Sequence, residues 1–308
     1  MKRFYRNLLW FILSIVILLG GAEFMVRQIP NEYKYKNDWM DKHAEEVETL
    51  ILGNSYTQTG INPDLLDGNA FNLSISGQDY VYSHFLFFKW ADRLKKLKIL
   101  IMPVSYFSFY KTPHGDNSEL MQELNYRIYM GNPFYKYDIA YNMESLYYKH
   151  LYGKIRDFFN GESVKWKRKG WLPWYFADKS DVWNADHVNK ALARIYLADS
   201  VKYENINRNY EYVAEIARFC RKQGIRLVLV TTPQTKEYNK CLSSQQIMRT
   251  NSLVERLKRE YGLEYYDYRE DYSYEDADFY DQSHLSEFGA EKFTRLFKYS
   301  WSIETTTI

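Results

Sequence analysis

The sequence has little cysteine and almost no net charge. Its 308 residues include two cysteines, with Cys220 on a predicted helix and Cys241 in a predicted loop. This scarcity excludes a disulfide scaffold and a cysteine-rich zinc site, and leaves open either a single bridge or two free thiols. The formal net charge of +2 gives no reason to expect a nucleic-acid partner.

Two kinds of ligand motif are also missing. No Gly-x-Gly-x-x-Gly pattern or phosphate-binding P-loop follows the first predicted strand, which argues against a nucleotide- or flavin-binding protein. Five of the six histidines are scattered and form no His-x-x-x-His pair: His43, His84, His114, His150 and His187. We therefore expect neither a metal site nor a cofactor.

The N-terminus combines basic residues with an apolar run. Three basic residues come first: Lys2, Arg3 and Arg6. The apolar run then extends from Leu8 to Ala22. This order favours a signal anchor over residues 1–27 that crosses the cell membrane once, with residues 28–308 forming a domain outside the cytoplasm. Gly20 and Ala22 also have the small-x-small spacing of a signal-peptidase site, so export followed by cleavage is the alternative.

The rest of the chain alternates predicted strands and helices. Five short segments are predicted to be strands: Thr49–Gly53, Ala70–Leu73, Lys98–Val104, Arg226–Thr231 and Glu264–Tyr268. Helical patterns cover Tyr80–Lys96, Tyr210–Cys220 with a stop at Gly224, Ser243–Gly262, and a stretch that begins near Ser286. Continuous apolar runs are typical of parallel strands covered on both faces. The order predicts an α/β protein, a three-layer α/β/α sandwich with a parallel, flavodoxin-like doubly wound sheet.

The alternation is interrupted between the third and fourth predicted strands. We expect residues 107–203 to form a mostly helical insertion over one edge of the sheet, because a loop of that length without structure is implausible. Its segment Lys165–Trp174 interleaves cations with tryptophans. Such a segment suits a membrane interface, an acidic polysaccharide or stacking on sugar rings, which makes Trp166 and Trp171 candidate substrate contacts. The alternative is a solvated basic turn whose tryptophans anchor the insertion to the core.

Two short segments near the ends of the domain supply the parts of a nucleophilic site. Ser55 follows the first predicted strand directly, and ligands of open parallel sheets bind at the carboxyl ends of the strands. Asp281 and His284 lie just before the last predicted helix, three residues apart, so one turn can hold the carboxylate against one imidazole nitrogen. The other nitrogen is then free to take a proton from Ser55, which is the arrangement that nucleophilic acyl chemistry needs.

These segments resemble the motifs of the SGNH, or GDSL-type, hydrolase superfamily. Gly53-Asn54-Ser55 matches the family's Gly-Asp-Ser block with Asn in place of Asp, and Asp281-x-x-His284 matches its last block. The segment from Asn72 to Gly77 is similar to the second block. The resemblance implies that Ser55 is the nucleophile, His284 the base and Asp281 the orienting carboxylate. It also implies an oxyanion hole that includes the N–H groups of Ser55 and Gly77.

The sequence departs from the family at the third block. The family has Gly-x-Asn there, whereas this chain has Pro103-Val104-Ser105 after its third predicted strand. Ser105 is the candidate replacement donor of the oxyanion hole, and loss of one such donor costs about 3–4 kcal/mol of transition-state stabilisation. Asn54, at the family's Asp position, is a further candidate substrate contact. The departures resemble those of membrane-anchored members that move acyl groups onto cell-envelope polymers.

Two functions follow as hypotheses. The first is a serine esterase or O-acyltransferase that acts on acetyl-type esters of cell-envelope carbohydrate through an acyl-enzyme on Ser55. The second is a catalytically inactive protein of the same fold that binds glycan or is the partner of a membrane acyltransferase. The reactivity of Ser55 discriminates between them, since a binding protein has no need of an activated serine.

Overall fold

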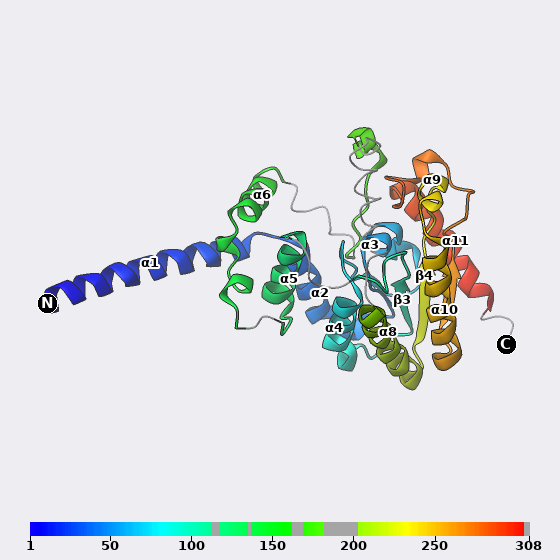
Figure 1. Ribbon diagram of the computed structural model, residues 1–308, viewed down its shortest axis with the longest axis horizontal. Helices are drawn as coiled ribbons and strands as arrows, with labels where there is room; N and C mark the ends of the chain where they lie inside the picture. The colour runs from blue at the N-terminus through cyan, green and yellow to red at the C-terminus, as the bar shows by residue number, and fades with distance from the viewer. Residues whose placement is uncertain (112–116, 135–136, 162–168, 182–202, 305–308) are drawn as a thin grey trace. The chain divides into compact units, whose positions relative to one another are not determined.

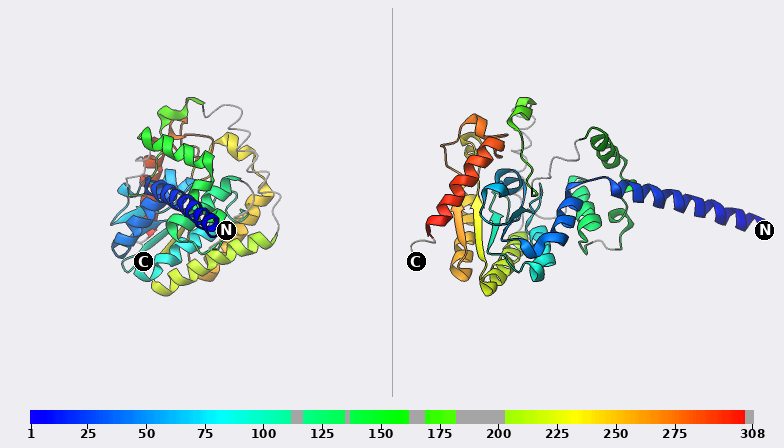
Figure 2. Two further views of the ribbon diagram at one scale, coloured as in Figure 1. Left: turned by 90° about the vertical axis from the view of Figure 1, so that its left-hand side faces the viewer. Right: turned by 180° about the vertical axis from the view of Figure 1, so that it is seen from behind.

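The computed structural model describes residues 1–111, 117–134, 137–161, 169–181 and 203–304. These residues form two compact units (Figures 1 and 2). Unit 1 comprises Met1–Asp38 and His114–Trp166, and unit 2 comprises Trp39–Pro113 and Lys167–Ile308. The predicted insertion at 107–203 is thus divided between the two units.

Unit 2 is built on one parallel sheet whose five strands were all predicted from the sequence. The strands are β1 (Thr49–Ile51), β2 (Ala70–Asn72), β3 (Ile99–Pro103), β4 (Arg226–Thr231) and β5 (Glu264–Asp267). They pair in the order β2-β1-β3-β4-β5, and every pair is parallel. This is the flavodoxin-like doubly wound order, so the predicted fold class is confirmed.

Helices cover both faces of this sheet. Helix α8 (Tyr203–Gln223) contacts both α4 (Tyr80–Trp90) and α10 (Ser244–Tyr261), while α3 (Ser55–Gly60) packs against α11 (Glu287–Glu304). Alternate residues of the strands reach the α11 side, where Ile101, Val228 and Val230 join Phe293 and Phe297 in a buried cluster. The remaining short elements described in this unit are the helix α9 (Lys236–Lys240) and the 3₁₀ turns at Ala44–Glu46, Pro63–Leu65, Ala91–Arg93, Phe176–Asp181 and Asp276–Asp278.

Local sequence signals set the ends of these helices. The Ser243 hydroxyl accepts a hydrogen bond from Gln246 N at the start of α10, and Gly262 ends the helix in a left-handed conformation with φ 71°. The predicted helix over Tyr80–Lys96 is shorter than expected. Asp79 caps its start, but α4 ends at Trp90 and a 3₁₀ turn, Ala91–Arg93, replaces its last part.

Unit 1 contains α1 (Lys2–Gln28), the start of α2 (Glu32–His43), α5 (Asn117–Met130) and α6 (Tyr148–Phe159). Two 3₁₀ turns, Ile139–Tyr141 and Glu144–Leu146, connect α5 with α6. Helix α1 is long and apolar enough to cross a membrane, and its apolar side chains are almost all exposed. A signal sequence near an N-terminus has the same character.

Gly53 is required by a close approach between β1 and β3. Its φ of +148° is rarely adopted by other residues, and a Cβ added here would lie 2.2 Å from Pro103 Cδ. We expect Gly53→Ala to lower the free energy of unfolding by about 2–5 kcal/mol, because the cost of a strained backbone and the cost of overpacking against Pro103 are summed. Urea unfolding measures the change. Gly60→Ala is the control, since a Cβ there meets ordinary contacts of 3.6–3.7 Å, and an equal loss in both variants would contradict the prediction.

Candidate functional site

The site lies where β1 ends and α3 begins. Leu52 N donates to Ile101 O, which carries the strand pairing to the last residue before Gly53. Asn54 then caps α3, with its Oδ1 accepting from Tyr56 N at 3.1 Å. The helix starts at Ser55, whose side chain is partly exposed. The carboxyl edge of the sheet therefore presents Ser55, as expected for ligand sites of this topology.

The second segment is a tight loop just before α11. Phe279 and Leu285 form an isolated antiparallel bridge, and Tyr280 N donates to His284 O at 3.0 Å across the loop. Ser286 N donates to Asp278 O at 2.9 Å and closes the loop a second time. These bonds hold Asp281 and His284 on one turn.

The two segments bring three side chains into a chain of hydrogen bonds. Ser55 Oγ lies 2.8 Å from His284 Nε2, and His284 Nδ1 lies 2.9 Å from both carboxylate oxygens of Asp281. Because an ionised carboxylate only accepts, Nδ1 carries the imidazole proton and Nε2 accepts from the Ser55 hydroxyl. The arrangement has the order nucleophile, base and orienting carboxylate.

Asp281 is held as a carboxylate by its surroundings. Its Oδ1 accepts from the backbone N–H groups of Ser283 and His284, each at 2.8 Å, and from Ser283 Oγ at 3.1 Å. Burial by itself would raise the pKa of Asp281, but the charge and hydrogen bond of His284 and the two backbone N–H groups outweigh it. The net effect is a pKa well below the usual range for an aspartate.

Aromatic rings enclose the imidazole. The Tyr56 ring stacks on His284 with centroids 4.7 Å apart and planes at 17°, and Trp174 contacts the imidazole at 4.7 Å and 53°. Tyr280 in turn contacts Trp174 at 4.9 Å. These contacts leave His284 only 3% exposed. Trp174 and Tyr56 were not singled out from the sequence. The tryptophan-rich segment around Trp174 was the only available signal.

Backbone N–H groups lie near the serine. As the first residue of α3, Ser55 has an N–H without a partner inside the helix. The loop after β2 is tied to β1 by a hydrogen bond of 2.9 Å from Ile75 N to Gly53 O, and it turns through Gly77 at φ +77°. Among the described residues the Gly77 N–H has no hydrogen-bond partner. The predicted role of these two N–H groups in an oxyanion hole stays a prediction.

Ser105 and Asn54 are both buried beside this loop. Ser105 Oγ lies 2.7 Å from Ser108 Oγ and accepts from Asn54 Nδ2 at 3.4 Å. Each is 3% exposed. The Ser105 hydroxyl thus has partners within the fold. Its predicted role as an oxyanion donor, and that of Asn54 as a substrate contact, stay predictions.

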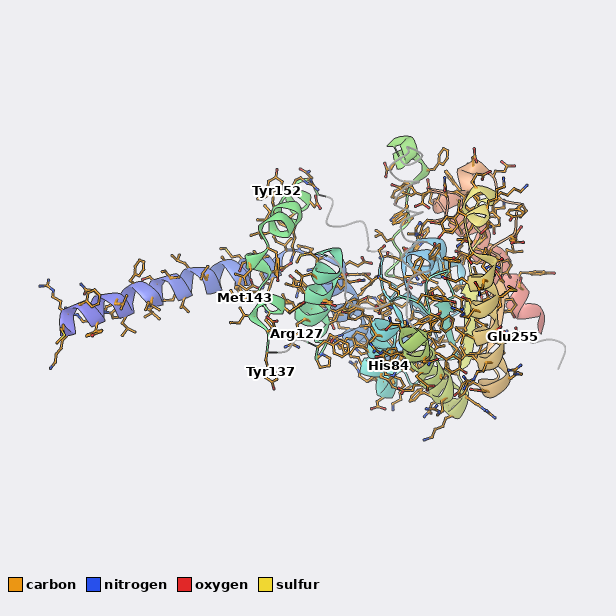
Figure 3. All side chains as sticks on the ribbon, in the orientation of Figure 1. His84, Arg127, Tyr137, Met143, Tyr152 and Glu255 are labelled. Atoms are coloured by element: carbon orange, nitrogen blue, oxygen red, sulfur yellow. The ribbon has the colours of Figure 1, made fainter. Side chains whose placement is uncertain are left out.

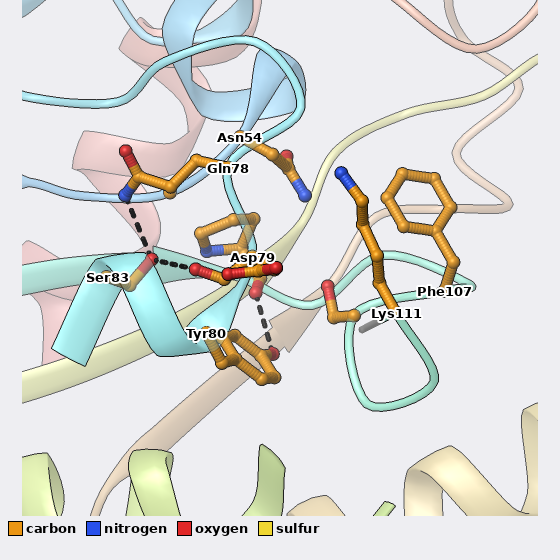
Figure 4. A pocket seen from close by; sticks show the side chains of 10 residues that line it. Asn54, Gln78, Asp79, Tyr80, Ser83, Phe107 and Lys111 are labelled. Carbon is orange, nitrogen blue, oxygen red and sulfur yellow. Dashed lines mark hydrogen bonds between the residues drawn. The ribbon is translucent and has the colours of Figure 1, made fainter. Parts of the chain in front are cut away.

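A small hollow opens beside these residues (Figure 4). Asn54, Asp79, Phe107 and Lys111 are among its lining residues, and the Asn54 amide and the Lys111 ammonium both point into it in the close-up view. Lys111 Nζ also donates to Gly77 O. No pattern in the sequence indicated that Lys111 would lie beside the serine.

The two tryptophans predicted as substrate contacts have different outcomes. Trp171 is 1% exposed, belongs to the buried cluster under α11, and donates from Nε1 to Thr59 O at 2.7 Å. This placement is that of a core residue, which the sequence analysis had named as the alternative. Trp166 lies outside the described residues.

The two cysteines do not pair with each other. Cys220 is buried and Cys241 exposed, and both are free thiols. Within the described ranges, no group of three or more His, Cys, Asp or Glu side chains is arranged to hold a metal ion.

Comparisons with known proteins give similarities among solved structures. No protein-family model matches the chain, and no curated protein sequence does. A GDSL-like lipase from Bacteroides thetaiotaomicron is 11% identical, with a TM-score of 0.42, and the match covers 87% of this chain and 97% of that one. A lipase/acylhydrolase from Enterococcus faecalis is 10% identical, with a TM-score of 0.40 and coverage of 82% and 95%. An acetyl xylan esterase is 12% identical, with a TM-score of 0.39 and coverage of 84% and 100%. At such low identity, the activity of this chain has to be argued from its own residues.

Proposed function

We propose that this chain is a serine-dependent enzyme that acts on acyl esters through an acyl-enzyme on Ser55. The observation that carries the proposal is the continuous hydrogen-bonded chain from Ser55 Oγ through His284 to Asp281. A serine that only fills a turn has no need of an imidazole acceptor that is itself oriented by a hydrogen-bonded carboxylate.

The proposed reaction has two halves. In the first, Nε2 of His284 takes the Ser55 proton while Oγ attacks the acyl carbonyl carbon, and Asp281 stabilises the imidazolium that forms. The N–H groups of Ser55 and Gly77 are the proposed donors to the oxyanion. The imidazolium then gives its proton to the leaving alcohol, and the acyl group stays on Oγ. In the second half, His284 deprotonates the acceptor, which attacks the acyl carbon of the acyl-enzyme. The bond between this carbon and Ser55 Oγ then breaks, and the imidazolium of His284 gives its proton back to Oγ.

The molecule that accepts the acyl group from Ser55 decides which of two activities the protein has. Water as acceptor makes the protein an esterase, and a sugar hydroxyl makes it an O-acyltransferase of cell-envelope carbohydrate. The basic residues in the first turns of α1, ahead of its apolar run, favour a membrane anchor with the domain outside the cytoplasm, where either activity would then take place. The rival function is an inactive carbohydrate-binding or scaffold protein that is the partner of a membrane acyltransferase. The occupied Ser105 hydroxyl and the absent Gly-x-Asn block favour that rival.

Covalent labelling by a fluorophosphonate tests the proposal. We expect one adduct on Ser55 in the full-length protein, located by mass spectrometry of its peptides. The adduct should be lost in His284→Ala, because the serine is then no longer activated. Folded protein without an adduct, or labelling that does not depend on His284, would refute the serine mechanism and favour the scaffold.

The Trp174 ring is expected to hold the imidazole in its productive position. We expect Trp174→Ala to lower kcat by about 2–10-fold, because aromatic pairs contribute about 0.5–1.5 kcal/mol beyond their buried area. Trp174→Phe should recover most of the rate. Hydrolysis of p-nitrophenyl acetate measures both. Equal kcat in wild type and Trp174→Ala would show that the ring has no positioning role.

A further inference from the structure

We propose that one face of unit 1 lies on the surface of a lipid bilayer. The contact surrounds the point where α1 emerges from the bilayer. This membrane-contact face consists of apolar side chains from the 3₁₀ turns and α6: Ile139, Leu146, Tyr152, Phe158 and Phe159. The inference goes beyond the catalytic site and rests on the part of the proposed function in which α1 spans a membrane.

The sequence of α1 sets the level of the bilayer surface. No charged residue occurs between Arg6 and Glu23. The uncharged stretch from Asn7 to Ala22 is roughly 24 Å long at about 1.5 Å per residue, which is shorter than the ~30 Å hydrocarbon core of a typical bilayer. As the first charged residue after this stretch, Glu23 marks the end of the part of α1 that suits the hydrocarbon.

Hydrogen bonds fix the turn at Glu144–Leu146 to that level. The Glu23 carboxylate accepts from Glu144 N at 3.1 Å and from Ser145 N at 2.9 Å. One turn later, Arg27 bonds Glu23 at 2.7 Å and donates to Asn142 O at 2.6 Å. Leu146, the next residue after Ser145, is 53% exposed. An exposed leucine is thus held close to the end of the membrane-spanning run.

A buried ion pair attaches α6 to the same turn. Lys154 Nζ lies 2.7 Å from Glu144 Oε1 and also donates to Tyr129 Oη, and the Lys154 and Glu144 side chains are 8% and 0% exposed. Burial lowers the pKa of Lys154, while the Glu144 carboxylate opposes the shift. A charge pair of this kind holds its partners strongly, because loss of either one leaves a buried charge alone. Helix α6 is therefore fixed relative to α1.

Helix α6 leaves part of its apolar stripe uncovered. Leu151, Ile155 and Phe158 follow a helical spacing. Leu151 and Ile155 are partly buried, whereas Phe158, Tyr152 and Phe159 are 44%, 69% and 80% exposed. Ile139, in the first 3₁₀ turn of unit 1, is another large apolar residue at the surface and is 69% exposed. The ribbon places α6 and the Met143 turn on either side of the end of α1 (Figure 3).

The composition of the face favours lipid over protein. Tyrosines and other aromatic residues are enriched where a protein meets the membrane–water interface, since one end of the ring system is apolar and the other is wet. Helices on bilayers bury an apolar face about 5–10 Å deep, which suits one edge of α6 rather than the whole helix. The membrane-contact face adjoins the apolar surface of α1, so the bilayer that α1 crosses is the partner that we assign to this face.

Site-specific fluorescence quenching tests this inference on the full-length chain. Cys241→Ser removes the exposed thiol, and burial raises the pKa of the Cys220 thiol to about 12, so that it stays unlabelled. Single cysteines at Tyr152 and Phe159 are labelled with the fluorophore NBD. The protein is then reconstituted in phosphatidylcholine vesicles with and without lipids that carry a nitroxide near the headgroup.

Two further labelled positions act as controls. Tyr299→Cys lies on α11 of unit 2 at a residue that is 66% exposed, and Ile17→Cys lies in the middle of α1. We expect a loss of about twofold or more in NBD intensity at positions 152 and 159, none at 299, and quenching at 17 by a nitroxide deep on the acyl chain.

Each other pattern overturns the inference in a distinguishable way. Quenching at 17 alone would keep the anchor and reject the membrane-contact face. No quenching at 17 would reject the anchor and the face together. Protection of positions 152 and 159 from both the nitroxide lipid and aqueous iodide would identify a protein contact, such as a second copy of the chain. Ester hydrolysis by the same labelled proteins reports separately on the proposed catalytic function.

Discussion

Replacing Ser55 with alanine is expected to abolish acyl-ester hydrolysis while the protein stays folded. Loss of the nucleophile from a site of this kind lowers kcat by about 10⁴–10⁶-fold, because binding and the oxyanion donors retain only a small part of the rate enhancement. The Ser55 side chain is partly exposed, and among the described residues its hydroxyl bonds His284 alone, so the substitution removes one partner of the imidazole and little else. The thermal midpoint should stay within a degree or two, as for other surface changes, at about ±0.5 kcal/mol.

The measurement compares p-nitrophenyl acetate hydrolysis and thermal unfolding in three proteins. Ser252→Ala is the control, since the Ser252 hydroxyl bonds only to Met248 O on the exposed face of α10. It should keep wild-type kcat. Residual activity of Ser55→Ala above about a hundredth of wild type would exclude Ser55 as the nucleophile, because the lost step has no substitute.

Replacing Asp281 with asparagine is expected to lower kcat by about 10⁴-fold. The carboxylate accepts a hydrogen bond from the Nδ1–H group of His284, which keeps the imidazole proton on Nδ1. Nε2 is therefore the acceptor for the Ser55 hydroxyl. An amide is able to donate to Nδ1 instead, which places the proton on Nε2 and removes the base. KM should change little, because Asp281 faces the imidazole rather than the hollow.

The chain offers a matched control for this variant. Asp271 accepts hydrogen bonds from Ser273 N at 3.1 Å and Ser273 Oγ at 2.7 Å, the same local motif that Asp281 forms with Ser283. Asp271 is also partly exposed, but within the described part of the chain it bonds no histidine. Asp271→Asn should keep full activity. If Asp281→Asn loses no more than Asp271→Asn does, the carboxylate only shapes the turn.

The lowered pKa of Asp281 also predicts how this contribution depends on pH. A group whose pKa is lower in the folded state than in the unfolded state stabilises the fold above the unfolded value, which is about 3.9 for aspartate. This contribution falls as the pH drops below that value towards the folded pKa. The difference in free energy of unfolding between wild type and Asp281→Asn should therefore be constant from about pH 7 to about pH 5 and shrink below about pH 4.

Urea unfolding at a series of pH values measures this difference. Asp271→Asn provides the baseline. A gap that grows on acidification would mean that the carboxylate is destabilised in the fold, contrary to the hydrogen bonds that it accepts.

The sequence by itself determined the parts of this protein that depend on neighbours along the chain. Short apolar runs predicted β1, β3 and β4, because parallel strands in the middle of a sheet are buried on both faces and carry few polar residues. The edge strand β5 was also predicted, although it is only partly buried. The cap at Ser243 and the glycine at 262 predicted the ends of α10, since the physics of helix termini is local. The spacing of Asp281 and His284 predicted their contact for the same reason.

The tertiary structure decided what depends on distant residues. Trp171 and Trp174 lie three residues apart in one aromatic segment, yet one fills the core under α11 and the other contacts His284. Lys111 comes to the hollow beside Asn54 only because β3 and β1 are neighbours in the sheet. The hydrogen bond from Asn54 to Ser105 and the bond from Ser145 to Glu23 are likewise long-range. A side chain's burial and partners are set by the packing of elements far apart in sequence, and the local pattern of residue types does not contain that information.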